Sequence, residues 1–306
     1  MKMHDFIIIG GGACGLTAGL YASRGGLKPL LLEKEAPGGQ LLLTDNIENY
    51  PGIEHINGFD LAQKMMNHAQ KFGLEMKYEG VETLDLHDDH VALKTKNGEY
   101  KAKYVLASLG SNPRKLGVPG EDKYRGKGVS YCATCDGAFY KDKECIIVGG
   151  GSSALDEGIA LAEHASKVTI VHRRDTFTGE KYLEDLAKKN EKIEFLMEHE
   201  VKEIRAGDDG KVDRVLLYDK KNDKEYEFAT EGVFIFIGYI PNSSILEGQV
   251  KLEHGEVVVN ATMQSSHPRL YAGGDIRQGS VKQVIASGGD GAMAAISILH
   301  KLRSEQ

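Results

Sequence analysis

Two segments of the chain repeat one pattern of apolar and polar positions. In the first, an apolar run at residues 6–9 precedes a glycine-rich loop, a helical pattern over 16–24 and a second apolar run at 30–32. The same order recurs at 145–148, 155–164 and 168–171. Short continuous apolar runs are typical of buried strands, and apolar positions three to four residues apart are typical of helices. Each segment is therefore predicted to form a β-α-β unit.

A glycine-rich loop joins the first strand to the helix in both units. The loops read Gly10-Gly11-Gly12-Ala13-Cys14-Gly15 and Gly149-Gly150-Gly151-Ser152-Ser153-Ala154, and both fit G-x-G-x-x-G/A. In this pattern the glycines allow a tight turn and a close approach to a pyrophosphate, and the helix amides bind its phosphates. A single match is often an ordinary turn, but here the whole unit is present twice. We therefore predict two dinucleotide sites, with contacts from Gly10, Gly12, Ala13, Gly15, Gly149, Gly151, Ser152, Ser153 and Ala154.

The residue that ends the second strand differs between the two units. Glu33 stands at the same spacing from Gly10 as His172 does from Gly149. An acid at this position binds an adenosine ribose hydroxyl, which favours FAD or NAD in the first unit. The run His172-Arg173-Arg174 instead offers cations for a ribose 2′-phosphate, which favours NADP(H) in the second unit.

The repeat continues beyond these units. Alternating segments at 76–104 and 195–228 predict β-meanders, and each is followed by an apolar strand, at 104–109 and 233–237. The fold class predicted is α/β, with two Rossmann-like dinucleotide-binding domains, each a three-layer ββα arrangement, and the second inserted in the first. The first domain comprises residues 1–114 and 243–306, and the second comprises 117–240.

Composition limits the classes of partner. Of the 306 residues, 41% are hydrophobic and 27% are charged, which is typical of a soluble globular protein. The formal charge of −7 argues against nucleic acid as a partner. No apolar stretch is long enough to predict a membrane span, and four cysteines are too few for a secreted disulfide scaffold. We expect a cytoplasmic protein.

Two of the cysteines, Cys132 and Cys135, form a C-x-x-C motif followed by Asp136. No second pair of cysteines or histidines completes a zinc site, so the motif indicates redox chemistry and we expect no metal. Asp136 is a candidate acid/base for thiol exchange, with a helix-capping carboxylate as the alternative. The two other cysteines, Cys14 and Cys145, are predicted to be small buried side chains.

The position of the pair suggests how it is used. The motif lies shortly before the second loop and therefore on the domain that is expected to bind the nicotinamide nucleotide. A flavin on the other domain cannot easily meet the nicotinamide and the disulfide in one arrangement. We therefore expect the two domains to alternate between arrangements about their two connections. Asp156 and Glu157 follow the second loop and are interpreted as acids of the first helical turn.

The chain resembles the low-molecular-weight thioredoxin reductases over essentially its whole length. The matching segments are Gly38-Gly39-Gln40, Glu48-Asn49-Tyr50-Pro51-Gly52, Cys132-Ala133-Thr134-Cys135-Asp136-Gly137, His172-Arg173-Arg174-Asp175, Gly273-Gly274-Asp275 and Ala286-Ser287-Gly288-Gly289-Asp290-Gly291. The resemblance implies a homodimer that passes electrons from NADPH through FAD to the Cys132–Cys135 disulfide and on to thioredoxin or a thioredoxin-like protein.

The resemblance also implies roles for single residues. Asp136 is the acid/base, Cys135 faces the flavin, and Cys132 attacks the disulfide of the partner. The residues implied near FAD, beyond the first loop and Glu33, are Gly39, Gln40, Asn49, Gly274, Asp275, Gln283 and Val284.

Departures from the family pattern leave alternatives open. Thr178 stands where the family usually has a third arginine, which makes NADH or another donor, such as ferredoxin or reduced flavin, more credible. The protein partner could also be a peroxiredoxin or a glutaredoxin-like protein. The remaining rivals are an oxidase that forms disulfides in a small molecule and a redox-sensing module without enzymatic activity.

Overall fold

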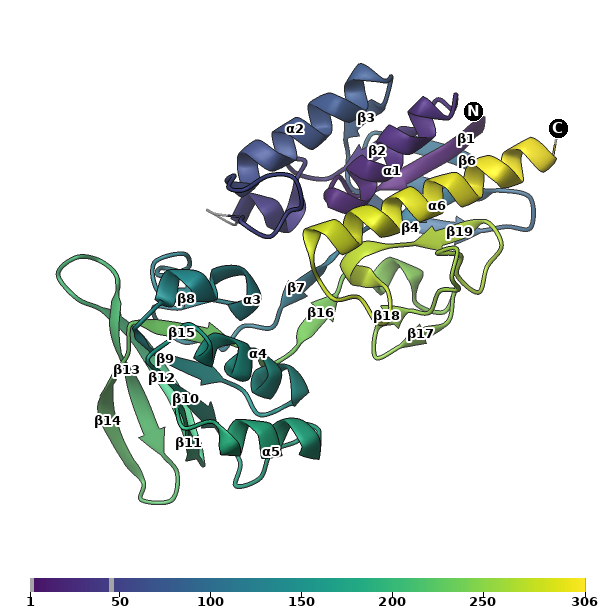
Figure 1. The fold of residues 1–306 in the computed structure, drawn as a ribbon. Coiled ribbons are helices and arrows are strands. Elements are labelled where there is room, and N and C mark those ends of the chain that lie inside the picture. The colour runs from purple at the N-terminus through teal and green to yellow at the C-terminus, as the bar shows by residue number, and fades with distance from the viewer. Residues whose placement is uncertain (1–2, 44–46, 306) are drawn as a thin grey trace. The chain divides into compact units, whose positions relative to one another are not determined.

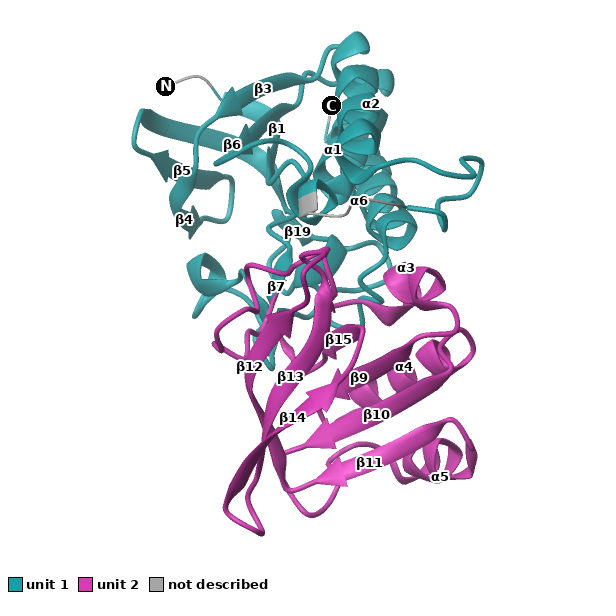
Figure 2. Ribbon diagram, turned by 90° about the vertical axis from the view of Figure 1, so that its left-hand side faces the viewer, with its two compact units in different colours: residues 1–112, 240–306 teal, residues 113–239 magenta. Residues whose placement is uncertain are grey.

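The computed structural model describes residues 3–43 and 47–305. The chain divides into two compact units, Met1–Asn112 with Ile240–Gln306 (unit 1) and Pro113–Tyr239 (unit 2), which Figure 2 shows in different colours. Each unit has helices packed on a sheet that is largely parallel (Figure 1). The predicted α/β class is therefore confirmed.

Unit 1 is built on a seven-stranded sheet. Its strands are β1 Met3–Ile9, β2 Leu30–Glu33, β3 Glu75–Tyr78, β4 Val81–Leu86, β5 Val91–Thr95, β6 Gly98–Ala107 and β19 Leu270–Ala272. The order is β3-β2-β1-β6-β5-β4, and β19 pairs with β6. The strands β3, β2, β1 and β6 run parallel in the order of half a Rossmann fold, whereas β4 and β5 are antiparallel.

Alternate side chains of β1 enter two different cores. Phe6 and Ile8 are buried against the helices α1 Ala13–Arg24 and α6 Val284–Ser304, and α2 Gly58–Lys71 packs beside α1. Ile7 and Ile9 are buried on the other face. This face is covered by β4, β5 and the segment that holds η3 Ser244–Leu246, β17 Leu252–Glu253, β18 Glu256–Val257 and η4 Gly274–Ile276. A two-residue period on a strand with both faces buried gives this arrangement.

Unit 2 repeats the plan with a five-stranded parallel sheet in the order β11-β10-β9-β15-β8. Its strands are β8 Val129–Ser130, β9 Glu144–Val148, β10 Lys167–His172, β11 Ile193–Met197 and β15 Gly232–Ile235. One face carries α3 Ala133–Asp136, η2 Gly137–Tyr140, α4 Ser152–Ala162 and α5 Lys181–Lys189. The other is covered by a three-stranded antiparallel sheet of β12 His199–Ala206, β13 Val212–Asp219 and β14 Lys224–Ala229.

The predicted meanders are wrong in their boundaries. Both expected segments begin inside a parallel strand, because β3 and β11 are the third strands of the two Rossmann-like sheets. In unit 1 the last meander strand and the strand expected at 104–109 are one strand, β6. Its first half pairs with β5, and its second half pairs with β19. A single long strand that changes partners cannot be distinguished from two short strands by its alternation.

The chain passes between the units twice, at β7 Ser111–Pro113 and β16 Tyr239–Pro241, and these two strands pair with each other. On the unit 1 side, Asn242 donates its backbone N–H to the Gly110 carbonyl and its side-chain amide to the Leu109 carbonyl, at 3.1 and 2.9 Å. On the unit 2 side, the Arg114 N–H donates to the Gly238 carbonyl at 2.9 Å. The two chain passages are therefore hydrogen-bonded to each other on the unit 1 side and on the unit 2 side.

Candidate active site

The first glycine of each glycine-rich loop lies against a backbone carbonyl that follows a neighbouring strand. Gly10 follows β1 and has a φ of +97°, and a Cβ there would lie 2.3 Å from the Ser108 carbonyl oxygen. Gly149 follows β9, and a Cβ there would lie 2.3 Å from the Phe236 carbonyl oxygen. Ser108 and Phe236 follow β6 and β15, the equivalent strands of the two sheets. Only glycine fits at either position, and each loop leads directly into α1 or α4.

Glu33 ends β2 and is buried beside the first loop. Its carboxylate accepts the backbone N–H of Gly11 at 2.6 Å and that of Glu35 at 2.8 Å. The side chain is thus fixed at the edge of the sheet where the first loop begins. This position is the one from which an acid reaches an adenosine ribose in Rossmann folds.

His172, the equivalent residue of unit 2, is buried rather than exposed. Its ring stacks on Phe177 and lies directly against Gly150 of the second loop, and its Nε2 is 3.1 Å from the Thr176 carbonyl oxygen. Burial is the main cause that lowers the pKa of His172, and the neighbouring Arg174 and Arg173 lower it further. The imidazole is therefore neutral at pH 7, and its contact with a 2′-phosphate stays a prediction.

The positively charged side chains predicted for the second site follow His172 in the chain. Arg173 and Arg174 are exposed in the turn after β10. The Lys220 ammonium, which the sequence did not single out, donates to the Arg173 carbonyl at 3.3 Å. Thr178 binds the second loop itself, because its N–H and its hydroxyl both donate to the Gly150 carbonyl, at 2.8 and 3.2 Å. The residue in the place of the third arginine is therefore part of the support of the loop.

A second group of predicted residues gathers in unit 1. Gly39 and Gln40 lie in η1 Gly39–Leu43, and the Gln40 amide donates to the Asn112 side chain at 3.1 Å. The Asn49 amide donates to the side chain of Gln283 at 3.1 Å, directly before Val284 begins α6. An open hollow of about 470 Å³ is lined by residues 48–54 beside this contact.

Asp275 is held in the short helix η4. Burial is the main cause that raises its pKa, and the Ser287 hydroxyl donates to it at 3.3 Å. The preceding Gly274 is fixed by Asp290 on α6, whose carboxylate accepts the Gly274 N–H at 2.9 Å and the Arg277 guanidinium at 2.6 and 3.0 Å. Asp290 is a functional residue that was not predicted on its own, although it lies in one of the segments that match the family. The feature of the sequence that could have indicated Asp290 is an acid within a helix segment made largely of small and apolar residues.

Cys132 and Cys135 form a disulfide across the first turn of α3. Cys132 caps the turn, and its Sγ accepts the backbone N–H of Cys135 at 3.1 Å. Both cysteines are partly exposed, as thiol exchange with a partner requires. Cys14 and Cys145 are buried, as predicted. Burial is the main cause that raises the pKa of both thiols, that of Cys145 to about 12.

Asp136 directly follows Cys135 in the chain and is partly exposed. Its carboxylate accepts the Ser130 hydroxyl at 2.6 Å, and the Ser130 oxygen in turn accepts the Cys132 N–H at 3.1 Å. Asp136 stands at the capping position of η2, but it makes no capping hydrogen bond with its side chain. The capping alternative is therefore wrong, and the carboxylate is connected to the backbone of Cys132 through a single hydroxyl.

The position of Glu157 in its helix differs from the prediction. It was expected to be an acid of the first turn of α4, but α4 begins at Ser152 and Glu157 lies in its second turn. Its carboxylate accepts the N–H of Ala133 at 2.7 Å, the N–H of Thr134 at 3.0 Å and the Thr134 hydroxyl at 3.3 Å. Burial is the main cause that raises the pKa of Glu157, and these hydrogen bonds oppose it. The acid therefore holds the C-x-x-C turn.

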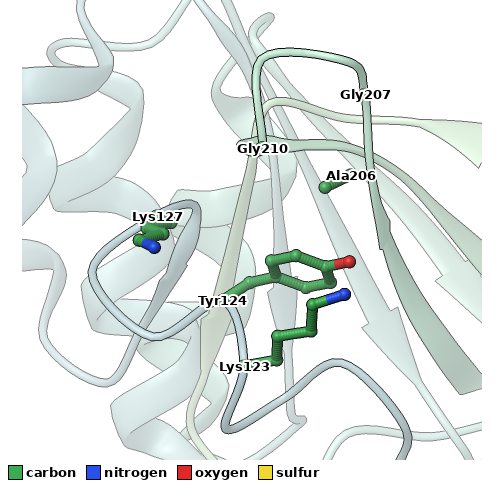
Figure 3. Close-up of a pocket in the computed structure, with 6 residues that line it drawn as sticks. All are labelled: Lys123, Tyr124, Lys127, Ala206, Gly207 and Gly210. Atoms are coloured by element: carbon green, nitrogen blue, oxygen red, sulfur yellow. The ribbon is translucent and has the colours of Figure 1, made fainter.

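Other features of the described residues add no second site. A hollow of about 270 Å³ in unit 2 is lined by Lys123, Tyr124, Lys127, Ala206, Gly207 and Gly210 (Figure 3), and none of the predicted site residues lines it. Within 3–43 and 47–305, no three His, Cys, Asp or Glu side chains are grouped so that they could hold a metal ion. Over the same residues, no helix is long and apolar enough to span a membrane.

Comparison with known proteins agrees with this geometry. The family model of the pyridine nucleotide-disulphide oxidoreductases matches residues 4–291. The chain is 44% identical to the thioredoxin reductase of Bacillus subtilis over 306 residues. The alignment covers 100% of this chain and 96% of that protein. It is 41% identical to the thioredoxin reductase of Listeria innocua, over 96% of this chain and 92% of that protein.

A solved structure extends the comparison to the fold. The thioredoxin reductase of Streptococcus pyogenes is 42% identical, covers 99% of each chain and superposes with a TM-score of 0.93. The predicted pair of Rossmann-like domains is thereby confirmed. A pyridine nucleotide and a flavin are the cofactor classes that follow from these matches. The two dinucleotide loops and the disulfide thus occur together in a chain that belongs to the pyridine nucleotide-disulphide oxidoreductase family.

Proposed function

We propose that the chain is a thioredoxin-disulfide reductase that takes electrons from NADPH, uses FAD as its flavin and reduces thioredoxin or a thioredoxin-like protein. The observation that carries the proposal is the partly exposed Cys132–Cys135 disulfide, linked to Asp136 through Ser130, on a unit with its own dinucleotide loop. The thioredoxin reductases among its relatives support the choice of partner.

The residues of unit 1 fit FAD. Glu33 is fixed beside the first loop and has the position to bind an adenosine ribose. Asp275 is a partly buried carboxylate. Its described hydrogen bond is a single one of 3.3 Å, so it retains acceptor capacity for the hydroxyls of a ribityl chain. When bound, FAD supplies a two-electron carrier between the nicotinamide and the disulfide.

Gln40, Asn49 and the start of α6 are proposed to hold the remainder of the flavin. The residues of unit 2 proposed to hold NADPH are Gly149, Gly151, Ser152, Ser153, Ala154, Arg173 and Arg174.

The reduced cysteine pair performs the exchange with the partner. The Cys132 thiolate attacks one sulfur of the partner disulfide, forms a mixed disulfide and releases the other partner sulfur as a thiolate. The Cys135 thiolate then attacks Cys132, which restores the Cys132–Cys135 disulfide and releases the second partner thiolate. Two electrons pass to the partner, and its two sulfurs take up two protons. Asp136, which is linked to the Cys132 backbone by two hydrogen bonds through the Ser130 hydroxyl, is proposed to move one of these protons.

Turnover is proposed to alternate between two arrangements of the units. The disulfide and the NADPH loop both belong to unit 2, whereas the FAD loop belongs to unit 1. A flavin bound on unit 1 has to meet each of them in turn. The paired passages at β7 and β16 are the proposed pivot, because the chain connects the units only there.

The first prediction concerns the flavin. We expect purified protein to be yellow with about one FAD per chain, because Glu33 is placed to hold an adenosine. Flavin released by heat is identified and counted by chromatography. FMN in place of FAD would contradict the role of Glu33, because FMN has no adenosine. A protein that contains no flavin as purified and binds none on reconstitution would contradict the proposed function.

The second prediction concerns the nicotinamide nucleotide. Arg173→Ala and Arg174→Ala are each expected to lower kcat/KM for NADPH roughly tenfold or more, because each charge-assisted contact contributes about 1.5–3 kcal/mol. The value for NADH should change little. Thr178→Arg restores the missing cation and is expected to raise the preference for NADPH, with Thr176→Arg, two residues away, as the control. A wild-type enzyme that uses NADH as well as or better than NADPH would overturn the assignment.

The third prediction separates the two cysteines. Cys135→Ser leaves the partner-facing thiol and is expected to accumulate a mixed disulfide with thioredoxin, whereas Cys132→Ser should trap none. Both variants should still oxidise NADPH with an artificial electron acceptor, because neither sulfur takes part in that half of the reaction. Non-reducing electrophoresis and mass spectrometry identify the trapped species. If Cys132→Ser traps the partner and Cys135→Ser does not, the two roles are reversed.

The fourth prediction concerns assembly. We propose a homodimer, and three exposed apolar side chains on one side of α6, those of Ile285, Met293 and Ile296, offer a contact surface. Light scattering should give twice the chain mass of 33.4 kDa. Met293→Glu should shift the protein towards the monomer, whereas Tyr182→Glu, on an exposed residue of unit 2, should not. A wild-type protein with the mass of one chain at micromolar concentration excludes the dimer.

A further inference from the structure

The backbone amides after Cys132 are shared between a sulfur and a carboxylate. Three N–H groups follow the cysteine, those of Ala133, Thr134 and Cys135. The Cys135 N–H donates to the Cys132 sulfur at 3.1 Å. The N–H groups of Ala133 and Thr134 donate instead to Glu157, at 2.7 and 3.0 Å. One of the three amides is therefore directed at the sulfur, and the other two at an acid on a neighbouring helix.

The number of amides directed at a cysteine controls its acidity. A thiolate at the start of a turn is stabilised by the N–H groups that point towards it, and its pKa falls below that of a free cysteine. A carboxylate that takes up two of these groups has the opposite effect. It removes donors from the sulfur, and its negative charge lies against the residues that flank the sulfur.

Other titratable groups also lie on the elements packed against the C-x-x-C turn. They include Asp136 on α3, Asp156 on α4 beside Glu157 itself, and His164 after α4, whose ring lies against Gly137. Tyr140 on η2 stays neutral, because burial is the main cause that raises its pKa and Asp136 raises it further. Of the acids, Glu157 is the one that binds the amides next to Cys132.

We propose that Glu157 is a positioning residue that keeps Cys132 a weak acid and thereby makes the reduced cysteine pair a stronger reductant. The proposal rests on the disulfide chemistry of the proposed function and adds a determinant of its driving force. Stabilising a thiolate stabilises the reduced form of a cysteine pair and makes its disulfide more oxidising. Glu157 withholds that stabilisation. A cysteine pair with a less stable thiolate is a stronger reductant, which suits an enzyme that gives electrons to other disulfides.

Glu157→Gln separates charge from shape. The amide oxygen of glutamine can accept the Ala133 and Thr134 N–H groups in place of the carboxylate, so the turn keeps its anchor while the negative charge is lost. Asp156→Asn is the matched control. It removes the same charge from the neighbouring position of α4, but Asp156 is exposed and is not the acceptor of these two amides.

The readout is the alkylation rate of Cys132 as a function of pH, measured with iodoacetamide on the FAD-bound Cys135→Ser protein. Cys14 and Cys145 are buried and have raised pKa values, so Cys132 is the thiol that reacts. Glu157→Gln is expected to lower the midpoint of the pH profile by about one pH unit. Below the midpoint the rate should rise about three- to fourfold, because the tenfold gain in thiolate is partly offset by its lower nucleophilicity. Asp156→Asn should leave the midpoint within a few tenths of a unit.

The outcomes decide the proposal without reference to turnover. The assay contains neither NADPH nor thioredoxin, so a protein that fails to reduce thioredoxin can still show the shift, and the two failures are distinguishable. If Glu157→Gln does not fold, Glu157→Asp keeps the charge but withdraws it by one methylene, and its midpoint is expected below that of the wild type. A midpoint that is unchanged or raised in the folded variant at position 157, or lowered equally by Asp156→Asn, overturns the proposal.

Discussion

The hydrogen bonds between Glu157 and the turn after Cys132 join the disulfide to the second dinucleotide loop. Glu157 stands on α4, and the same helix begins directly at that loop. The nucleotide loop and the cysteine pair are therefore linked through one helix within unit 2. The loop proposed to bind the electron donor and the disulfide that accepts the electrons thus belong to the same unit. The proposed alternation is accordingly a movement of a whole unit, and the paired passages at β7 and β16 are its proposed pivot.

The two units share a backbone arrangement but differ in the side chain at the end of the second strand, beside the glycine-rich loop. In unit 1 the last residue of the second strand is the acid Glu33, which is hydrogen-bonded to the first loop. In unit 2 it is His172, whose ring fills the space that Gly150 leaves open and stacks on Phe177. Two copies of one loop geometry can therefore be directed to different nucleotides by the residues beyond the loop. In unit 2 the exposed arginines, rather than the histidine, carry the positive charge.

Much of this organisation could be predicted from the sequence, because it depends on residues that are close together along the chain. The strand-loop-helix order, the C-x-x-C motif and the residues at the strand ends are all local patterns. The contacts that finish the site are not. Glu157 lies 24 positions from Ala133, Asp290 lies 16 from Gly274, and Lys220 lies 47 from Arg173. No spacing rule connects such pairs, and the strand exchange within β6 hid the true boundaries of the meander for the same reason.

In the proposed reaction, two electrons from NADPH reduce the disulfide of thioredoxin to two thiols. The most direct measurement follows NADPH oxidation, thiols formed on thioredoxin and oxygen uptake in one reaction, with Cys132→Ser as the blank. We expect two new thiols per NADPH oxidised, no oxygen uptake and no thiols in the blank. NADPH oxidation matched by oxygen uptake without new thiols, or thioredoxin reduced with ferredoxin but not with NADPH, would contradict it.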